Sequence, residues 1–517
     1  MYPCGFIAMF FLVVLTLIWG PQSSYGFGRV GFDMYHRFSD PVREILPADG
    51  LPKFGTLEYY AAMAHRDLIF HGRRLAGDGH PTPLIFAGGN VTYRSSLLGH
   101  LHYANISVGT PSLSFLVALD TGSGLLWLPC DCTSCTRSLK TSIGNVISFN
   151  IYSPSASSTS VNVPCSSSFC AQQKQCSTAR DTCPYQVSYL SNGTSSTGTL
   201  VEDVLHLTSY DQSKAVDALI PFGCGRVQTG SFLEGGAPNG LFGLGLDNIS
   251  VPSILAKEGL TANSFSMCFG SDGIGRIIFG DEGSSDQRET PFNFHDLYPT
   301  YNVGITQVDV GGNITRTSFS AIFDSGTSFS YLNDPVYTYV TDSFDSQAQE
   351  KRHQLDSNIP FDYCYDLDTS IVDFRAPSLI LTMEGGKQFN VTQPTVLVSL
   401  NGRYLYCLGV IKSGDVNIIG QNFMTGYRIV FDREKMVLGW IESNCYDTED
   451  FDTLPISPRA SAEAPSIAPP AAVVDPEAAA GAGNGSHISE AYPDNHSPLF
   501  NIFTCAFMLV FLSCLAI

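Results

Sequence analysis

Two matching stretches decide the fold of this chain. Ala118–Ser123 reads Ala-Leu-Asp-Thr-Gly-Ser, and Ile322–Ser328 reads Ile-Phe-Asp-Ser-Gly-Thr-Ser. The apolar residues before each aspartate are typical of a buried strand. The glycine lets the backbone turn back toward the carboxylate, and the small hydroxyl side chains can hydrogen-bond to it. We call Asp120–Ser123 the first Asp loop and Asp324–Thr327 the second, and we expect the two loops to face each other and place two carboxyls on one water.

A second pair of similar elements follows the two Asp loops in the same order. Leu241–Gly245 reads Leu-Phe-Gly-Leu-Gly, and Asn417–Gly420 reads Asn-Ile-Ile-Gly. One such apolar element that ends in glycine would carry no information. Because each follows one Asp loop, the pair predicts two halves of the chain with the same topology.

The composition narrows the class of protein. Charged residues make up 15% of the 517 residues, below the roughly 25% that is typical of soluble domains. Aromatic, β-branched, serine and glycine residues are plentiful and long helical periodicities are few, which predicts an all-β protein. The net charge of −20 argues against a nucleic-acid partner.

Cysteines and glycosylation motifs both favour the secretory pathway. Cys4 lies in an N-terminal apolar run, and Cys505 and Cys514 lie in a C-terminal one, so twelve of the fifteen cysteines remain between them. An even number fits six disulfides. A metal site at Cys130–Cys135 is the rival interpretation, but a second pair of ligands at zinc spacing is missing, so we expect no metal. Asn-x-Ser/Thr motifs occur at Asn90, Asn105, Asn192, Asn248, Asn313, Asn390, Asn484 and Asn495.

Both ends of the chain read as targeting segments. Residues 1–26 contain a short apolar run that ends at a small-residue site, and this predicts a signal peptide. Residues 447–484 are rich in proline, alanine and acidic residues and predict a disordered linker. Residues 485–517 combine a polar spacer with an apolar tail, which favours a GPI-attachment signal with Asn484 as the attachment site. A membrane-spanning tail is the alternative.

The remaining chain divides into three parts. Residues 27–85 carry mixed charge, a helical pattern and the dibasic pair Arg73-Arg74. They read as a pro-segment that is cleaved near this pair, or as an ordinary N-terminal extension. Residues 86–255 form an expected N-terminal lobe with a cysteine-rich insert, and residues 256–446 an expected C-terminal lobe.

Alternating residues predict a hairpin downstream of the first Asp loop. Tyr185–Tyr189 alternates like a strand, a turn follows at Asn192-Gly193, and the chain returns through Thr199–Leu207. The hairpin is either a plain surface element or a mobile cover over a cleft. Its position after the first Asp loop favours a cover.

These motifs together are typical of one protein family. The chain resembles the pepsin-like aspartic proteases, and most closely the plant nepenthesin-like branch with a cysteine-rich insert. The resemblance covers roughly residues 95–445, and it rests on the two Asp loops, the two apolar elements and the hairpin in the family's order. It implies a bilobal β-fold with two β-rich lobes and a central cleft.

The resemblance also implies roles for individual residues. Asp120 and Asp324 match the catalytic pair, and Gly122 and Gly326 match the loop glycines. The other matches are the hydroxyls that brace the two loops (Thr121 and Ser325), the hydroxyls that bond the carboxylates (Ser123 and Thr327), and the tyrosine of the flap with its tryptophan partner (Tyr189 and Trp127). Ser325 replaces a more usual threonine but keeps the hydroxyl. After Tyr189 the hairpin tip reads Leu190-Ser191-Asn192-Gly193, where the family has a short glycine-rich tip, so we expect a longer flap.

Disulfide partners follow only from the same resemblance. It implies the pairs Cys364–Cys407 and Cys268–Cys445, and within the insert it implies Cys165–Cys183 and Cys170–Cys176. The pairing among Cys130, Cys132, Cys135 and Cys224 stays open, because connectivity does not follow from sequence.

The expected activity is the hydrolysis of peptide bonds by a water molecule between two carboxyls. Because two nearby carboxyls cannot both ionise cheaply, they share one proton, which predicts an acidic pH optimum and needs no cofactor. We expect a monomer with protein or peptide substrates, attached through a lipid anchor to the outer face of the plasma membrane; a secreted or single-span form is the alternative. An inactive binding or inhibitor protein of the same fold is the main rival function. A two-carboxylate glycosidase and a serine nucleophile at Ser123 fit the motifs less well.

Overall fold

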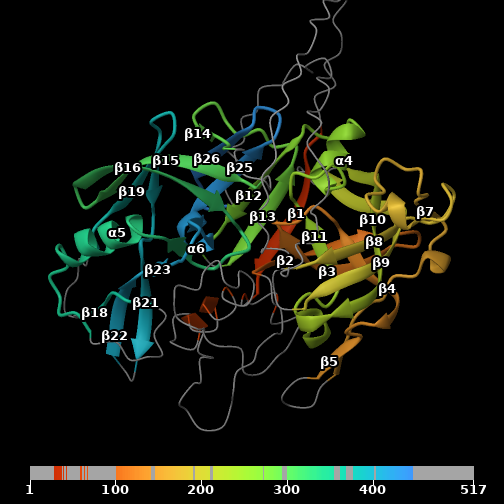
Figure 1. Ribbon diagram of the computed structural model, residues 1–517, viewed down its shortest axis with the longest axis horizontal. Helices are drawn as coiled ribbons and strands as arrows, with labels where there is room; N and C mark the ends of the chain where they lie inside the picture. The colour runs from red at the N-terminus through yellow and green to blue at the C-terminus, as the bar shows by residue number, and fades with distance from the viewer. Residues whose placement is uncertain are drawn as a thin grey trace, which may run out of the picture. The chain divides into compact units, whose positions relative to one another are not determined.

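The computed structural model describes residues 28–37, 39, 42, 59–60, 63–64, 67, 101–140, 146–189, 193–209, 214–271, 273–293, 300–353, 361–367, 376–400 and 403–445. Strands dominate these ranges and the helices are short, so the prediction of an all-β fold is confirmed (Figure 1). The predicted signal peptide, the linker, the tail and Asn484 lie outside the described residues. No helix in the described ranges is long and apolar enough to cross a membrane.

The largest sheet among the described residues has fourteen strands. Their order is β14-β26-β25-β12-β13-β1-β2-β3-β11-β4-β10-β9-β7, and β8 pairs with β9 off this path. The strands are β1 (Val30–His36), β2 (His102–Val108), β3 (Leu113–Asp120), β4 (Trp127–Ser134), β7 (Val161–Asn162), β8 (Pro184–Ser188), β9 (Ser195–Ser209), β10 (Ala215–Thr229), β11 (Leu241–Gly243), β12 (Ser264–Phe269), β13 (Ile274–Phe279), β14 (Arg288–Pro291), β25 (Tyr427–Asp432) and β26 (Val437–Glu442). Strands from both predicted lobes therefore share one sheet.

The second sheet contains the other Asp-bearing strand. Its order within the described ranges is β20-β19-β15-β16-β24-β17-β23. These strands are β15 (Asn302–Val310), β16 (Asn313–Phe323), β17 (Ser330–Leu332), β19 (Leu379–Met383), β20 (Gln388–Val391), β23 (Val410–Lys412) and β24 (Ile418–Ile419).

Smaller elements complete the described chain. Strands β18 (Cys364–Asp366), β22 (Arg403–Leu408) and β21 (Thr395–Leu400) form one small sheet, and β5 (Ser138–Lys140) and β6 (Val146–Ser148) form another. The α-helices are α4 (Val251–Lys257), α5 (Val336–Asp345) and α6 (Gln421–Met424), and the 3₁₀ turns are η2 (Pro154–Ala156), η3 (Gln173–Gln175) and η4 (Gly230–Glu234).

The same pattern of strand pairing occurs around each Asp loop. Strand β3 pairs in parallel with β11, β11 is antiparallel to β4, and β4 is parallel to β10. Strand β16 likewise pairs in parallel with β24, β24 is antiparallel to β17, and β17 is parallel to β23. The prediction of two halves with one topology is confirmed.

The glycines of the two apolar elements are explained by close backbone contacts. A Cβ atom on Gly243 would overlap the backbone of Gly124 and Leu125, just after the first Asp loop. A Cβ atom on Gly420 would overlap the backbone of Phe329, just after the second. Only glycine lets these elements pass so close behind the Asp loops.

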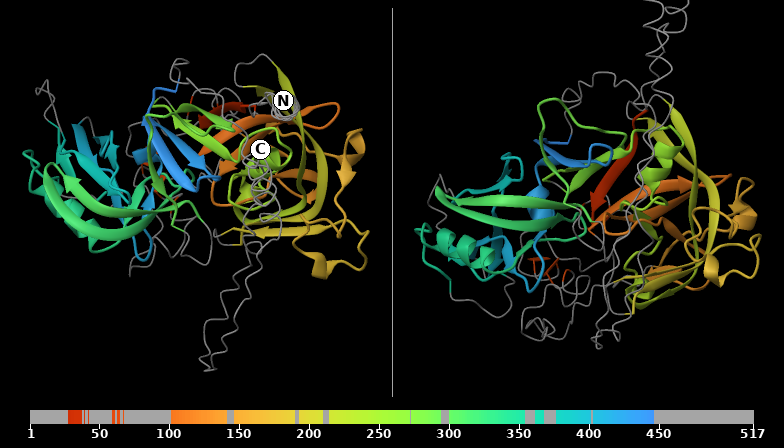
Figure 2. Two further views of the ribbon diagram at one scale, coloured as in Figure 1. Left: turned by 90° about the horizontal axis from the view of Figure 1, so that it is seen from above. Right: turned by 45° about the horizontal axis from the view of Figure 1, so that its top comes forward.

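Strand β1 comes from the 27–85 segment, and its place in the large sheet was not predicted. It pairs with β13 from Val30 to Tyr35 on one edge and with β2 and β9 on the other. In Figures 1 and 2 this red strand lies between orange and green strands. In the strand order of this sheet, β1 joins the β13 side to the β2 side. Val30 and Met34 are fully buried, so the strand is packed into the core.

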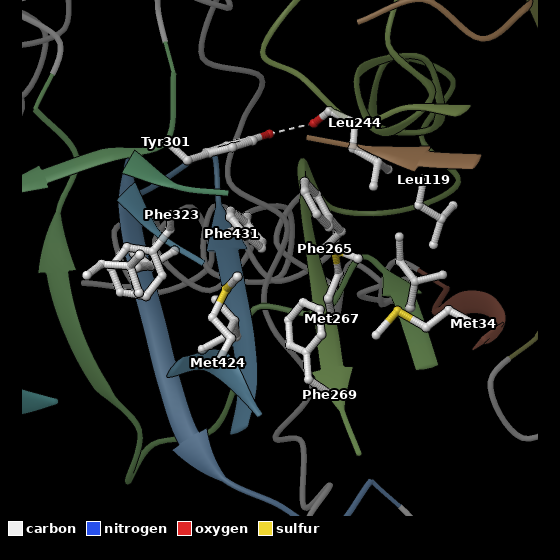
Figure 3. Packing of buried hydrophobic residues seen from close by; sticks show 14 of the residues in the cluster. Met34, Leu119, Leu244, Phe265, Met267, Phe269, Tyr301, Phe323, Met424 and Phe431 are labelled. Carbon is white, nitrogen blue, oxygen red and sulfur yellow. Dashed lines mark hydrogen bonds between the residues drawn. The ribbon is translucent and has the colours of Figure 1, made fainter. Parts of the chain in front are cut away.

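One large hydrophobic cluster underlies both Asp loops. It includes Leu119 and Phe323, the residues directly before the two aspartates, which are 2% and 0% exposed. Figure 3 shows both side chains in this cluster together with Phe265 and Phe431. The strand ends that carry the aspartates are therefore anchored in the core, which limits how far either loop can move.

Six disulfides join the twelve cysteines from Cys130 to Cys445, as their number predicts. Cys364–Cys407 and Cys268–Cys445 form as expected. The four cysteines whose pairing the sequence left open form the bonds Cys130–Cys224 and Cys132–Cys135.

The expected pairs Cys165–Cys183 and Cys170–Cys176 are wrong: the bonds are Cys165–Cys176 and Cys170–Cys183. The strand register explains the error. The Cys183 amide donates to Val163 and the Cys165 amide to Asp181, so Cys165 and Cys183 are offset rather than opposite each other.

The glycosylation candidates differ in exposure. Asn105, Asn248 and Asn313 are exposed, whereas Asn390 is only half-exposed. Asn90 and Asn192 lie outside the described residues. Exposed asparagines are the ones that a glycan can reach.

Candidate active site

The first Asp loop begins at the last residue of β3. The backbone N–H of Gly122 donates to Asp120 Oδ1 at 2.9 Å, and the Ser123 hydroxyl donates to Asp120 Oδ2 at 2.6 Å. A Cβ atom on Gly122 would lie 3.2 Å from Asp120 Oδ1, so a larger residue would crowd the carboxylate. Each oxygen of the carboxylate thus has its own donor from within the loop.

The second Asp loop follows β16 and repeats this geometry. The Gly326 N–H donates to Asp324 Oδ1 at 2.7 Å, and the Thr327 hydroxyl donates to Asp324 Oδ2 at 2.6 Å. The two similar loop sequences, Asp-Thr-Gly-Ser and Asp-Ser-Gly-Thr, therefore form the same cage of hydrogen bonds around each carboxylate.

The two Asp loops meet. The hydroxyl oxygens of Thr121 and Ser325 lie 3.4 Å apart, and both residues are buried. A Cβ atom on Gly326 would lie 2.9 Å from Asp324 Oδ1 and 4.0 Å from Asp120 Oδ1. Both carboxylates consequently face one small region beside Gly326.

The predicted hairpin forms, with β8 and β9 paired in register. Its tip at 190–192 lies outside the described residues. Trp127 Nε1 donates to the Tyr189 hydroxyl at 2.8 Å, so the structure brings together the two residues that the resemblance paired. Burial raises the pKa of Tyr189, and the negative charge of Asp120 raises it further. The phenol therefore keeps its proton.

Phe232 is a site residue that the sequence did not reveal. Its ring packs against Trp127 with the centroids 4.9 Å apart and against Tyr189 at 5.1 Å. It lies in η4, far along the chain from both partners, and no local motif marks it. Phe232 supports the contact between Tyr189 of the hairpin and Trp127 of β4.

Asp67 is a second residue that sequence reasoning missed. Its fully buried carboxylate accepts hydrogen bonds from the Ser328 N–H at 3.0 Å, the Ser328 hydroxyl at 2.7 Å and the Phe329 N–H at 3.2 Å. The Tyr331 hydroxyl donates to it at 3.1 Å. A carboxylate from the 27–85 segment therefore binds the residues that directly follow the second Asp loop.

A half-buried carboxyl, that of Asp247, lies next to the first Asp loop and feels the charge of the buried Arg433. The Asp247 side chain lies against Gly124, and burial raises its pKa although the positive charge of Arg433 lowers it. Burial also lowers the pKa of Arg433, whose guanidinium donates to Ser250 and Ser253. Asp247 thus places a carboxyl that resists ionisation against the loop that carries Asp120.

One cysteine cluster has sulfurs close enough for a metal. The sulfurs of Cys165, Cys170 and Cys176 lie within 4.8 Å of one another. All three are in disulfides, which removes the thiolates that a metal ion would bind.

Comparison with solved structures identifies the fold. The chain matches basic 7S globulin from soybean with a TM-score of 0.53 and 23% identity, over 67% of this chain and 94% of that one. It matches conglutin gamma from lupine seeds with a TM-score of 0.52 and 21% identity, over 67% and 92%. Together with the paired Asp loops, these matches place the chain in the class of pepsin-like folds.

Sequence comparison identifies the family. Residues 102–281 match the family described as xylanase inhibitor N-terminal, and residues 300–442 match xylanase inhibitor C-terminal. The chain is 55% identical over 478 residues to Aspartyl protease family protein 1 of Arabidopsis thaliana, which covers 92% of both chains. It is 41% identical over 433 residues to Aspartic proteinase-like protein 1 of the same plant, over 80% of this chain and 81% of that one. The chain belongs to the plant family of pepsin-like aspartic proteases.

Proposed function

We propose that this protein is an aspartic endopeptidase that uses Asp120 and Asp324 as a catalytic dyad. The observation that carries the proposal is the pair of identical carboxylate cages that face one region beside Gly326. Membership of the aspartic protease family supports it. Peptide bonds in proteins or peptides are the substrates.

In the proposed reaction the two carboxyls hold one proton between them. The ionised carboxylate takes a proton from the bound water, whose oxygen attacks the scissile carbonyl carbon, while the protonated carboxyl gives its proton to the carbonyl oxygen. The resulting gem-diol then breaks its C–N bond as the amine leaves with a proton from the dyad. The hydroxyls of Ser123 and Thr327 hold one oxygen of each carboxylate and so fix both acids in place.

The hairpin would close over the substrate. Tyr189 sits on β8's end of the hairpin and is held by Trp127 and Phe232 on the first lobe. Its neutral phenol can donate or accept a hydrogen bond next to the dyad. Closure of such a cover excludes water from the reacting bond.

We further infer that residues 27–85 act as a pro-segment. Tyr59, Tyr60, Met63 and Ala64 are buried in one cluster with C-terminal residues such as Phe329 and Phe361. Asp67 adds its hydrogen bonds to Ser328. These contacts support a segment that docks beside the second Asp loop. Cleavage at Arg73-Arg74 would come after this docking.

The location we propose is the secretory pathway, with a GPI anchor on the outer face of the plasma membrane. Six disulfides and three exposed glycosylation motifs support passage through an oxidising compartment. A phospholipase that cleaves GPI anchors should release the protein from cell membranes. Persistent membrane association after this treatment would favour a spanning tail.

The test of the activity is cleavage of a denatured protein at acidic pH, with and without a statine-type inhibitor, by the full chain after processing. Cleavage that the inhibitor blocks supports the proposal. A correctly folded sample that cleaves nothing but binds a partner protein would favour the second candidate, a binding or inhibitor protein. That candidate is favoured by the descriptions of both matched families, which name inhibitors. The two intact Asp loops argue against it.

A further inference from the structure

Tyr301 connects the backbones that carry the two aspartates. It lies just before β15 and is 2% exposed. Its carbonyl accepts the N–H of Phe323, the residue before Asp324, at 3.0 Å. Its hydroxyl donates to the Leu244 carbonyl at 2.7 Å, which Figure 3 shows as a dashed line. The Leu244 N–H in turn donates to the Asp120 carbonyl at 2.8 Å.

This single side chain therefore completes a path of hydrogen bonds from one Asp loop to the other. The path can be compared with the hydroxyl contact between Thr121 and Ser325. At 3.4 Å, the contact between the two hydroxyls is longer than the usual O–H···O distance of about 2.7–2.8 Å. The bond from Tyr301 to Leu244, at 2.7 Å, has the usual length. The bond through Tyr301 is the stronger of these two links between the loops.

The ring of Tyr301 is held firmly in place. Its centroid lies 4.6 Å from that of Phe431, 5.4 Å from that of Phe292 and 6.0 Å from that of Phe265. A ring packed between three others has no room to swing its hydroxyl away from Leu244. The link is therefore rigid.

The link also persists at every pH at which the dyad could work. Burial raises the pKa of Tyr301 to about 12, with the nearby charges of Arg433 and Asp247 as smaller, opposing influences. The phenol consequently keeps the proton that it donates to Leu244.

We propose that Tyr301 is a positioning residue that sets the distance and orientation between the two dyad carboxyls. It touches no reacting atom, and it acts through Leu244 and Phe323. The role rests on the proposed proteolysis, because the dyad is the group that it positions. Without the hydroxyl, each loop would still keep the hydrogen bonds to its own carboxylate. The position of one loop relative to the other would be less well fixed.

Tyr301→Phe tests the proposal, because it removes the hydroxyl alone. Tyr427→Phe is the control: Tyr427 is also fully buried and donates to a backbone carbonyl, that of Asn390, at 2.6 Å, with a longer contact to Glu442 at 3.5 Å. Tyr427 lies in β25, a strand that carries no Asp loop. We expect similar losses of thermal stability from both variants. Only Tyr301→Phe should lower kcat, by about tenfold and with KM unchanged, because the loss of the bond to Leu244 shifts the dyad carboxyls from their working geometry and leaves substrate binding as it is.

The pH profile adds a readout that a merely structural role would not change. Two carboxyls that move apart repel each other less, so their two apparent pKa values should move closer together. The bell-shaped profile of kcat/KM should therefore narrow in Tyr301→Phe and keep its width in Tyr427→Phe.

Hydrogen exchange separates this proposal from the proposed activity. In Tyr301→Phe the amides of Leu244 and Phe323 should exchange faster than in the wild type, and in Tyr427→Phe they should not. If the wild type cleaves no substrate, the proposed activity fails, and the exchange rates alone decide whether Tyr301 couples the loops. Equal exchange and equal kinetics in the two variants would overturn the role of Tyr301.

Discussion

Asp67→Ala is the most informative perturbation of the 27–85 segment. The variant removes the acceptor of four hydrogen bonds, three from the backbone and hydroxyl groups of Ser328 and Phe329 and one from Tyr331. A buried donor left without a partner costs about 1–3 kcal/mol. Because undocking of the segment would let water reach some of these donors, we expect a net loss of about 3 kcal/mol. This is roughly a hundredfold increase in the undocked population.

Hydrogen exchange at Ser328 and Phe329 measures this directly. Their amides donate to Asp67, so they should exchange roughly a hundredfold faster in Asp67→Ala. Asp33→Ala is the control within the same segment: Asp33 pairs with Arg276 at 3.0 Å but is 46% exposed, so its loss should cost no more than about 0.5 kcal/mol. Unchanged exchange in Asp67→Ala, or an equal effect in both variants, would refute the docking role of Asp67.

Two further predictions concern the second Asp loop and the carboxyl that lies next to the first. Gly326→Ala places a methyl group 2.9 Å from one dyad carboxylate and 4.0 Å from the other, so peptide hydrolysis should fall about a hundredfold while the melting temperature changes little; near-normal activity would contradict the geometry. Asp247→Asn should raise the melting temperature at pH 7. Burial raises the pKa of Asp247 above its unfolded value. The protonated Asp247 carboxyl therefore stabilises the fold at low pH, and this stabilisation is lost as the pH rises through the folded pKa. Melting curves from pH 3 to pH 7 should converge below about pH 4, with Arg433 as the opposing charge; a variant that is less stable at pH 7 would show that the pair with Arg433 outweighs burial.

The sequence predicts the parts of the site that are encoded locally. The two Asp loops, their hydrogen-bonding hydroxyls and the apolar elements behind them all follow from short stretches that occur twice. Equivalent residues form the same hydrogen bonds to the carboxylate in each copy, so the geometry of one loop follows from that of the other. The pairing of Trp127 with Tyr189 came from the resemblance, and the structure places the two side chains in contact.

The sequence does not predict contacts that depend on one residue and a distant partner. Tyr301, Phe232 and Asp67 each act through a side chain that no motif marks, and their partners are known only once the strands are paired. The crossed pairs Cys165–Cys176 and Cys170–Cys183 depend on a register that is offset by two positions. The place of β1 depends on pairing between strands far apart in the chain, which local patterns do not encode.

The most direct test of the account is a double-mutant cycle on the dyad. Asp120→Asn, Asp324→Asn and the double variant are compared with the wild type for kcat/KM on one peptide at acidic pH, with circular dichroism as the check on folding. If the two acids act as one singly protonated centre, each single variant should lose about a thousandfold or more, and the double variant should be little worse than either. Substantial activity in either single variant, or losses that multiply in the double variant, would contradict a shared centre.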